Sequence, residues 1–220
     1  LIDSSCWGST INSGPNLHFS DQVRSASERG ALGQRTEHIF IQLGFNDAWG
    51  TQVTMKDSVK HCLFDAAHGC GDEAVRAGAM QDPAAITGTH YADRVRQVVD
   101  YLKYYAPKAK ITLVGYQEMV PPSGGEVCTN VAGQQARKAD APALVQAVNN
   151  IDRAQREAAE QLKLGFIDLK TASAGHSSCS ADPWVNGVGD ARATMMGGVW
   201  HPSVHAEEIT GDIIAQYVRQ

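Results

Sequence analysis

Two loops of this chain carry side chains that could act on a substrate by oxyanion binding and acid–base chemistry. The first reads Gly44-Phe45-Asn46-Asp47 and directly follows an apolar run. A glycine permits a tight turn at the end of a strand, and a side-chain amide placed there can donate a hydrogen bond to negative charge that develops on a substrate oxygen. Asn46 is therefore the candidate oxyanion donor, although such a tetrapeptide also forms ordinary turns.

The second loop reads Gly198-Val199-Trp200-His201-Pro202 and leads into the last predicted helix. A histidine held between an aromatic residue and a proline is positioned by the backbone, as a general base must be. His201 is therefore the candidate base. A half-exposed loop histidine without a role is the alternative for any one of the eight histidines.

A metal site is a competing interpretation of the same loop. His205 lies four residues after His201, a spacing that places two ligands on one helix face. The glutamate of a His-Glu-x-x-His pattern is missing, and the sequence offers no evident third ligand. We therefore expect neither a metal nor an organic cofactor.

Alternating apolar runs and helical spacings predict the elements that position these loops. Buried strands are expected at residues 38–43, 110–115 and 165–168, and helices at residues 87–105, 141–162 and 204–219. Strands separated by such helices indicate an α/β fold of three layers, α/β/α, with a central parallel sheet. Functional loops then gather beyond the carboxyl ends of the strands. Because no repeat or linker divides the chain, residues 1–220 are expected to form a single domain.

Composition and charge narrow the functional classes. Hydrophobic residues make up 43% of the chain and charged residues 20%, which is ordinary globular usage. The formal net charge is -5, and the 19 lysines and arginines are scattered, so nucleic acid is not an expected partner. No apolar run approaches the roughly 18 residues of a membrane helix, so no transmembrane segment is predicted.

The chain holds five cysteines: Cys6, Cys62, Cys70, Cys128 and Cys179. None belongs to a Cys-x-x-Cys pair. We interpret them as disulfide-forming residues of a secreted, extracellular protein, with five buried thiols as the alternative. The odd number leaves one cysteine free or paired outside the chain.

The two loops, in this order and at this separation, resemble two conserved blocks of the SGNH (GDSL-type) hydrolases. Residues 182–187 (Asp-Pro-Trp-Val-Asn-Gly), with His176 and Cys179, are similar to a segment of the secreted actinobacterial lipases, esterases and phospholipases A. The resemblance implies a flavodoxin-like fold and disulfide bonds from Cys62 to Cys70 and from Cys128 to Cys179. It also implies a serine ester hydrolase of the carboxylesterase, lipase or acetylesterase type that works through an acyl-enzyme intermediate.

The nucleophile of the family is the serine of a Gly-Asp-Ser block, and this chain offers Ile2-Asp3-Ser4. Only two residues precede Asp3, too few to form the strand that supports the serine. The segment from Ser4 to Asn46 is also too short for the further strand, helix and glycine block that the family places there. Ser4 is therefore only the alternative nucleophile.

Residues 5–10 (Ser-Cys-Trp-Gly-Ser-Thr) instead resemble the second block of the family. The resemblance then assigns Gly8 to the oxyanion hole, where its backbone N–H joins Asn46. On this alignment residues 1–220 lack the N-terminal strand and the Gly-Asp-Ser block. We expect a separate N-terminal polypeptide to carry the serine and to be disulfide-linked through Cys6, which explains the odd cysteine.

The family commonly has an aspartate three residues before the catalytic histidine, and this chain has Gly198 there. The resemblance implies that the backbone carbonyl of Gly198 accepts the imidazole N–H of His201 and orients the ring. Asp182 is the alternative acid, although a role in bracing its own loop is favoured for it.

The sequence leaves the ester open: small-molecule, lipid and sugar esters all fit. Apolar residues near the loops could line an acyl pocket or belong to the core: Trp7, Phe45, Trp49, Met195 and Met196. A competing function, prompted by the missing Gly-Asp-Ser block, is a secreted binding protein on the SGNH scaffold without catalytic activity.

Overall fold

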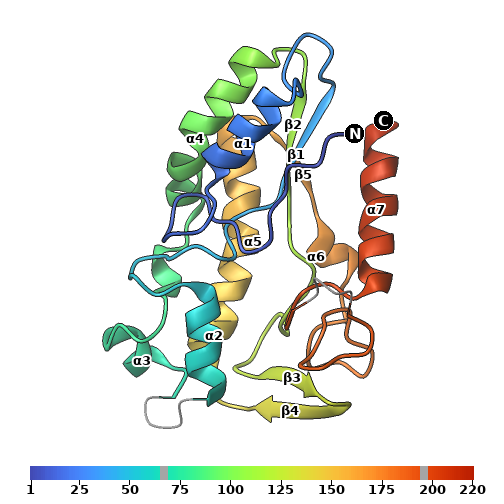
Figure 1. Cartoon of the computed structure of the whole chain (residues 1–220). Helices are drawn as coiled ribbons and strands as arrows, with labels where there is room; N and C mark the ends of the chain where they lie inside the picture. Colours follow the sequence, from blue (N-terminus) through green and yellow to red (C-terminus); the bar gives the residue numbers. More distant parts are fainter. Residues whose placement is uncertain (65–68, 194–197) are drawn as a thin grey trace.

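A parallel sheet lies at the centre of the computed structural model, which describes residues 1–64, 69–193 and 198–220 (Figure 1). Its strands are β1 (His38–Ile41), β2 (Lys110–Val114) and β5 (Gly165–Ile167), in the order β1-β2-β5. His38 pairs with Lys110, and Val114 pairs with Ile167. Six of the twelve strand residues are β-branched, four of them isoleucine, and such side chains pack well on a pleated surface that is covered on both faces.

Helices cover both faces of the sheet (Figure 1). One layer contains α1 (Phe19–Glu28), α4 (Gly88–Tyr105) and α5 (Pro142–Leu162), and the other contains α6 (Leu169–Ala172) and α7 (Val204–Val218). The main hydrophobic core includes the buried faces of α4 and α5, whereas Ile213, Ile214 and Tyr217 of α7 pack on Val114 and Ile167. The predicted α/β/α arrangement with a parallel sheet is confirmed. No described helix is both long enough and apolar enough to cross a membrane.

The predicted strands and helices occur at the expected places, with ends that shift by one or two residues. The first strand ends at Ile41 instead of residue 43. The backbone carbonyl of Leu43 does not pair within the sheet but accepts hydrogen bonds from Tyr91 Oη (2.8 Å) and Gln155 Nε2 (3.0 Å). Thr87 caps α4 rather than belonging to it, since its hydroxyl accepts the backbone N–H of His90. The ends therefore differ where side chains replace regular backbone pairing.

Several elements escaped the sequence prediction. They are α1, α2 (Met55–Phe64), α3 (Asp72–Arg76), the 3-10 helix η1 (Pro83–Ala85) and an antiparallel hairpin of β3 (Val127–Val131) and β4 (Gln134–Lys138). The residues of β4 are nearly all exposed, so this strand shows no apolar alternation. Ala132 and Gly133 both have positive φ angles at the hairpin turn, as a two-residue β-turn of this kind requires.

Disulfide bonds join Cys62 to Cys70 and Cys128 to Cys179. Both pairings implied by the family resemblance are confirmed, and the alternative of five buried thiols is wrong. Cys6 is an exposed free cysteine in the described part of the chain.

Candidate functional site

The loop after β1 is shaped by Gly44, which has a φ of +110°. A Cβ atom at this position would lie 2.7 Å from Cε2 of Tyr91, so the contact and the backbone conformation both require glycine. Its carbonyl accepts a hydrogen bond from Trp49 Nε1 at 3.0 Å. The turn that carries Asn46 is therefore held against the core.

Asn46 is half-buried, and its side chain faces the N-terminal segment. Its Nδ2 atom donates a hydrogen bond to the carbonyl of Ser9 at 3.2 Å. The neighbouring Phe45 packs on Tyr116 with 5.5 Å between ring centroids. The structure thus brings the Asn46 loop directly onto the segment that contains Gly8.

Residues 6–9 form a tight turn. The backbone N–H and the hydroxyl of Ser9 donate to the carbonyl of Cys6 at 3.2 and 2.7 Å, and Gly8 has a φ of +75°. Within residues 1–64, 69–193 and 198–220, the Gly8 N–H has no hydrogen-bond acceptor. Gly8 directly precedes Ser9, the residue whose carbonyl binds Asn46.

The backbone of His201 is fixed by the segment at residues 184–186. The N–H of Asn186 donates to the His201 carbonyl at 2.7 Å, and Trp200 N–H donates to the Asn186 carbonyl at 2.9 Å. Ser203 N–H donates to the Trp184 carbonyl at 2.7 Å, and the Ser203 hydroxyl caps α7. These bonds hold the main chain on both sides of His201.

Trp200 anchors the same loop in the core. It has a φ of +66°, a strained conformation for a bulky residue, and its indole is buried. Nε1 of Trp200 donates to the carbonyl of Cys128 at 3.3 Å. This hydrogen bond therefore links the Cys128–Cys179 disulfide to the residue that precedes His201.

The imidazole of His201 contacts an exposed aromatic ring from the N-terminal segment. The Nε1 atom of Trp7 donates to Nε2 of His201 at 2.5 Å, although the Trp7 residue is 63% exposed. An indole only donates, so Nε2 is an acceptor and the neutral ring carries its hydrogen on Nδ1. Burial lowers the pKa of His201 below its ordinary value, which favours this neutral form.

The Gly198 carbonyl accepts the backbone N–H of His201 at 3.0 Å. A Cβ atom at Gly198 would lie 3.6 Å from Cδ2 of His201 and 3.6 Å from Cζ2 of Trp7. Gly198 therefore lies against both rings. A carbonyl oxygen can accept two hydrogen bonds, so the Gly198 carbonyl has room for the imidazole N–H of His201 as well. That second bond stays a prediction.

Asp182, the alternative acid, is paired with a different histidine. His176 Nδ1 lies 2.8 Å from the Asp182 carbonyl and 3.3 Å from its carboxylate, and the Asp182 side chain is 73% exposed. His176 also stacks on Trp184 at 4.2 Å between centroids. Asp182 thus braces its own loop.

Ser4, the alternative nucleophile, lies at the exposed N-terminal segment. Arg29 Nη1 donates to the Ser4 hydroxyl at 3.3 Å and to the Asp3 carbonyl at 2.7 Å. The hydrogen-bond partner of His201 Nε2 is Trp7 instead of this serine.

Within residues 1–64, 69–193 and 198–220, potential metal ligands do not gather at His201. Among the described residues, the one cluster of three such side chains is Glu126, Cys128 and Cys179, and its two sulfur atoms are joined in a disulfide. His205 contacts the edge of Trp184 at 5.3 Å between centroids.

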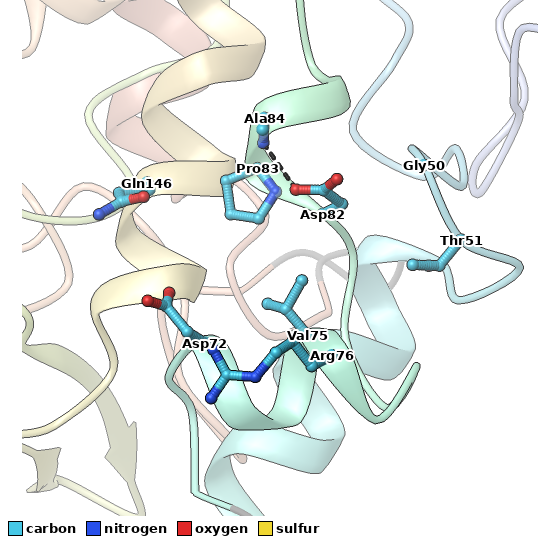
Figure 2. Close-up of a pocket in the computed structure, with 9 residues that line it drawn as sticks. All are labelled: Gly50, Thr51, Asp72, Val75, Arg76, Asp82, Pro83, Ala84 and Gln146. Atoms are coloured by element: carbon cyan, nitrogen blue, oxygen red, sulfur yellow. Dashed lines mark hydrogen bonds between the residues drawn. The ribbon is translucent and has the colours of Figure 1, made fainter.

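Of the residues considered for an acyl pocket, Trp49 is fully buried and stacks on Tyr91 in the core. Met195 and Met196 lie outside the described residues. A separate open pocket of about 500 Å³ occurs between α3, η1 and α5 (Figure 2). Its lining includes Asp72, Arg76 and Gln146 but neither His201 nor Asn46, so it is distinct from the site described above.

Sequence reasoning missed the buried ion pair between Asp47 and Arg94. The sequence signal was an arginine within the apolar pattern of α4, three residues after Tyr91 and next to Val95. It missed the Trp7 contact as well, for which the sequence carries no signal.

A family model described as the GDSL-like Lipase/Acylhydrolase family matches residues 4–209. The chain is 28% identical over 138 residues to an esterase of Streptomyces scabiei, covering 57% of this chain and 40% of that protein. It is 25% identical over 181 residues to lipase 1 of Streptomyces coelicolor, covering 81% and 59% of the two proteins. The chain thus spans about half the length of the curated relatives it matches.

Two solved structures share the fold. Phospholipase A1 from Streptomyces albidoflavus gives a TM-score of 0.65 at 18% identity, covering 96% of this chain and 77% of that one. An extracellular lipase from Streptomyces rimosus gives a TM-score of 0.56 at 20% identity, covering 83% and 71%.

Proposed function

Because the chain belongs to the GDSL-like lipase/acylhydrolase family, we propose that residues 1–220 supply the general base and the oxyanion hole of a secreted serine ester hydrolase. One observation carries this proposal: the turn at residues 6–9 bonds to both candidate loops. Trp7 contacts His201, the Ser9 carbonyl contacts Asn46, and Gly8 lies between these two contacts in the chain. These two contacts support a common location for the base and both oxyanion donors.

In the proposed reaction, Nε2 of His201 accepts the proton of a serine hydroxyl while the serine oxygen attacks the ester carbonyl. The N–H of Gly8 and the amide of Asn46 bind the oxyanion. The ester C–O bond then breaks, and the imidazolium returns its proton to the departing alcohol. Water attacks the acyl-enzyme in the same way and releases the acid. The Gly198 carbonyl is the proposed acceptor for the Nδ1 hydrogen.

The nucleophile of this proposal lies in a Gly-Asp-Ser segment outside residues 1–220. Its hydroxyl takes the place of the Trp7 indole at Nε2 of His201. The hydrogen bond from Arg29 to the Ser4 hydroxyl supports this assignment over one in which Ser4 is the nucleophile. The segment belongs either to the same polypeptide or to a separate one that is disulfide-linked through Cys6, which is exposed and free.

The substrate is a carboxylic ester of a lipid, a sugar or a small alcohol. The names of the relatives, which include esterases, lipases and a phospholipase A1, support this class. The two disulfide bonds support an oxidising, extracellular environment.

Labelling with a fluorophosphonate probe tests the proposal on the complete protein as it is isolated, without reduction. The expected result is one labelled serine in a Gly-Asp-Ser peptide, with labelling lost in His201→Ala and retained in His205→Ala. A protein that takes no label and cleaves no p-nitrophenyl ester would instead be the binding protein of the competing hypothesis. Label on Ser4 would overturn the assignment of the nucleophile.

Mass spectrometry before and after reduction tests the partner. If reduction lowers the measured mass to that of the polypeptide that contains residues 1–220, the result supports a second polypeptide bound through Cys6. An unchanged mass together with an alkylated Cys6 excludes it.

A further inference from the structure

Asp47 directly follows Asn46, and its side chain is 0% exposed. Oδ2 accepts the backbone N–H of Ile11 at 2.8 Å, and Oδ1 accepts the backbone N–H of Asn12 at 3.3 Å and the hydroxyl of Ser13 at 3.0 Å. A buried carboxylate needs such donors to offset the loss of water. The carboxylate thus ties the Asn46 loop to the backbone that follows Gly8.

Arg94 reaches the same point from α4, and its side chain is 10% exposed. Its guanidinium forms an ion pair with Asp47, donates through Nε to Asn12 Oδ1 at 2.7 Å and donates through Nη1 to the Ala48 carbonyl at 3.0 Å. It also lies 4.3 Å from the centroid of the Trp49 ring. The planar guanidinium of Arg94 therefore binds residues of both loops and fixes the loops to helix α4. A lysine, with its donors on one nitrogen, cannot reproduce this arrangement.

Stability alone is a weak reason for this pair. Burial lowers the pKa of Arg94, and the Asp47 charge opposes that shift, so removal from water acts against the charged form. Buried ion pairs are often no more stabilising than apolar residues of the same size. What the pair does provide is a fixed relation between two loops that are also joined by the bond from Asn46 to Ser9 and by the bond from the Ala48 N–H to the Ser13 hydroxyl.

We propose that Asp47 and Arg94 are positioning residues that hold Gly8 and Asn46 at the spacing an oxyanion requires. The inference rests on the proposed function. Neither side chain touches the substrate; both act through the two loops. The loops carry donors that must lie about 3 Å from one substrate oxygen, so a small displacement of one loop weakens transition-state binding more than substrate binding.

Arg94→Lys in the complete protein tests this role. We expect kcat for a p-nitrophenyl ester to fall about 100-fold, as for a donor displaced by about 1 Å, with KM nearly unchanged. The affinity for a boronic acid, which mimics the tetrahedral intermediate, is expected to fall with kcat. Arg156→Lys is the matched control, because Arg156 also pairs with an aspartate, Asp168 at 2.9 Å, and lies 4.6 Å from the centroid of Phe166. In the described part of the chain its partners lie outside both loops.

Hydrogen exchange gives a readout that does not depend on turnover. Faster amide exchange at residues 8–13 in Arg94→Lys, with unchanged exchange in α5, is the expected result. If Arg94→Lys does not fold, Asn12→Ala provides the same test, since it removes an exposed acceptor of the guanidinium.

A kcat that matches the wild type, a change in KM alone, or an equal loss in Arg156→Lys would overturn the positioning role. So would unchanged exchange at residues 8–13. A wild-type protein without esterase activity would instead overturn the proposed function, while the exchange experiment would still report whether Arg94 holds the Gly8 segment.

Discussion

The indole nitrogen of Trp7 lies 2.5 Å from Nε2 of His201 and donates a hydrogen bond to it. This contact makes Nε2 an acceptor, which is the form of the ring that a general base needs. It also occupies the position at which a serine hydroxyl would bind. Trp7 is therefore a reporter of the protonation state of His201 and a group that the proposed nucleophile displaces.

In a protein of residues 1–220 alone, in which no proposed nucleophile displaces Trp7 from His201, the Trp7 indole signal is expected to follow the protonation of His201. When the pH falls, the imidazolium no longer accepts this hydrogen bond, so the indole N–H resonance shifts. Burial lowers the pKa of His201, so the midpoint is expected below the ordinary value of about 6.5. A pH series of ¹H–¹⁵N spectra measures it.

Trp49 and Trp200 serve as internal controls, because their indoles donate to backbone carbonyls. A midpoint at or above 6.5, or a common shift of all three indoles, would contradict the contact.

The rate of ester hydrolysis is expected to depend on the same titration. The neutral imidazole is the active form, so kcat/KM falls as the pH drops through the pKa of His201. Because burial lowers that pKa, the acid limb is expected below about pH 6.5. His201→Ala is expected to lose about 10²- to 10⁴-fold in kcat.

His205→Ala tests whether these effects are specific, since His205 contacts Trp184 instead of the base. Both the rate and the acid limb should stay near the wild-type values. Suppose that the acid limb shifts in His205→Ala and is still present in the residual activity of His201→Ala. The titration would then belong to another group.

Asn46→Ala is expected to lower kcat by about 10²- to 10³-fold with little change in KM, because an oxyanion donor acts mainly in the transition state. Steady-state kinetics with a p-nitrophenyl ester measure both constants. Asn150→Ala is the matched control, since Asn150 Nδ2 also donates to a backbone carbonyl, that of Pro83 at 2.8 Å. Equal losses in the two variants would argue for a structural effect instead of an oxyanion contact.

The two disulfide bonds are expected to differ in their contribution to stability. Their sequence separations are 51 residues for Cys128–Cys179 and 8 residues for Cys62–Cys70. Loop entropy then predicts that replacing the first pair with serine costs about 4 kcal/mol, and the second about 2.5 kcal/mol, in the free energy of unfolding. Urea denaturation of the two double variants measures the difference.

The Cys128 pair should also affect the site, because the Cys128 carbonyl accepts the hydrogen bond of the Trp200 indole beside His201.

A Cys128→Ser/Cys179→Ser variant that is less destabilised than Cys62→Ser/Cys70→Ser would contradict the loop-length argument.

Among the elements that the sequence predicted, α4, α5 and β2 are strongly buried. The apolar residues of α4 and α5 recur at helical spacing, and β2 is a continuous branched run, so each pattern carries its own periodicity. The β3–β4 hairpin escaped because β4 is largely exposed and makes its contacts through backbone pairing, which leaves no apolar pattern. The helix α1 buries only Phe19 and Val23, so few apolar positions mark it in the sequence.

The sequence by itself determined the α/β order, the location of Asn46 and His201 in loops and, through family resemblance, both disulfide bonds. Only the tertiary structure decided that Trp7 donates to His201 and that Asp47 and Arg94 are paired. Local periodicity indicates which face of each helix or strand is buried, and turn residues indicate where each element ends. Contacts between loops that are far apart in the chain depend instead on how the sheet and helices place their ends in space, and no local pattern encodes that placement.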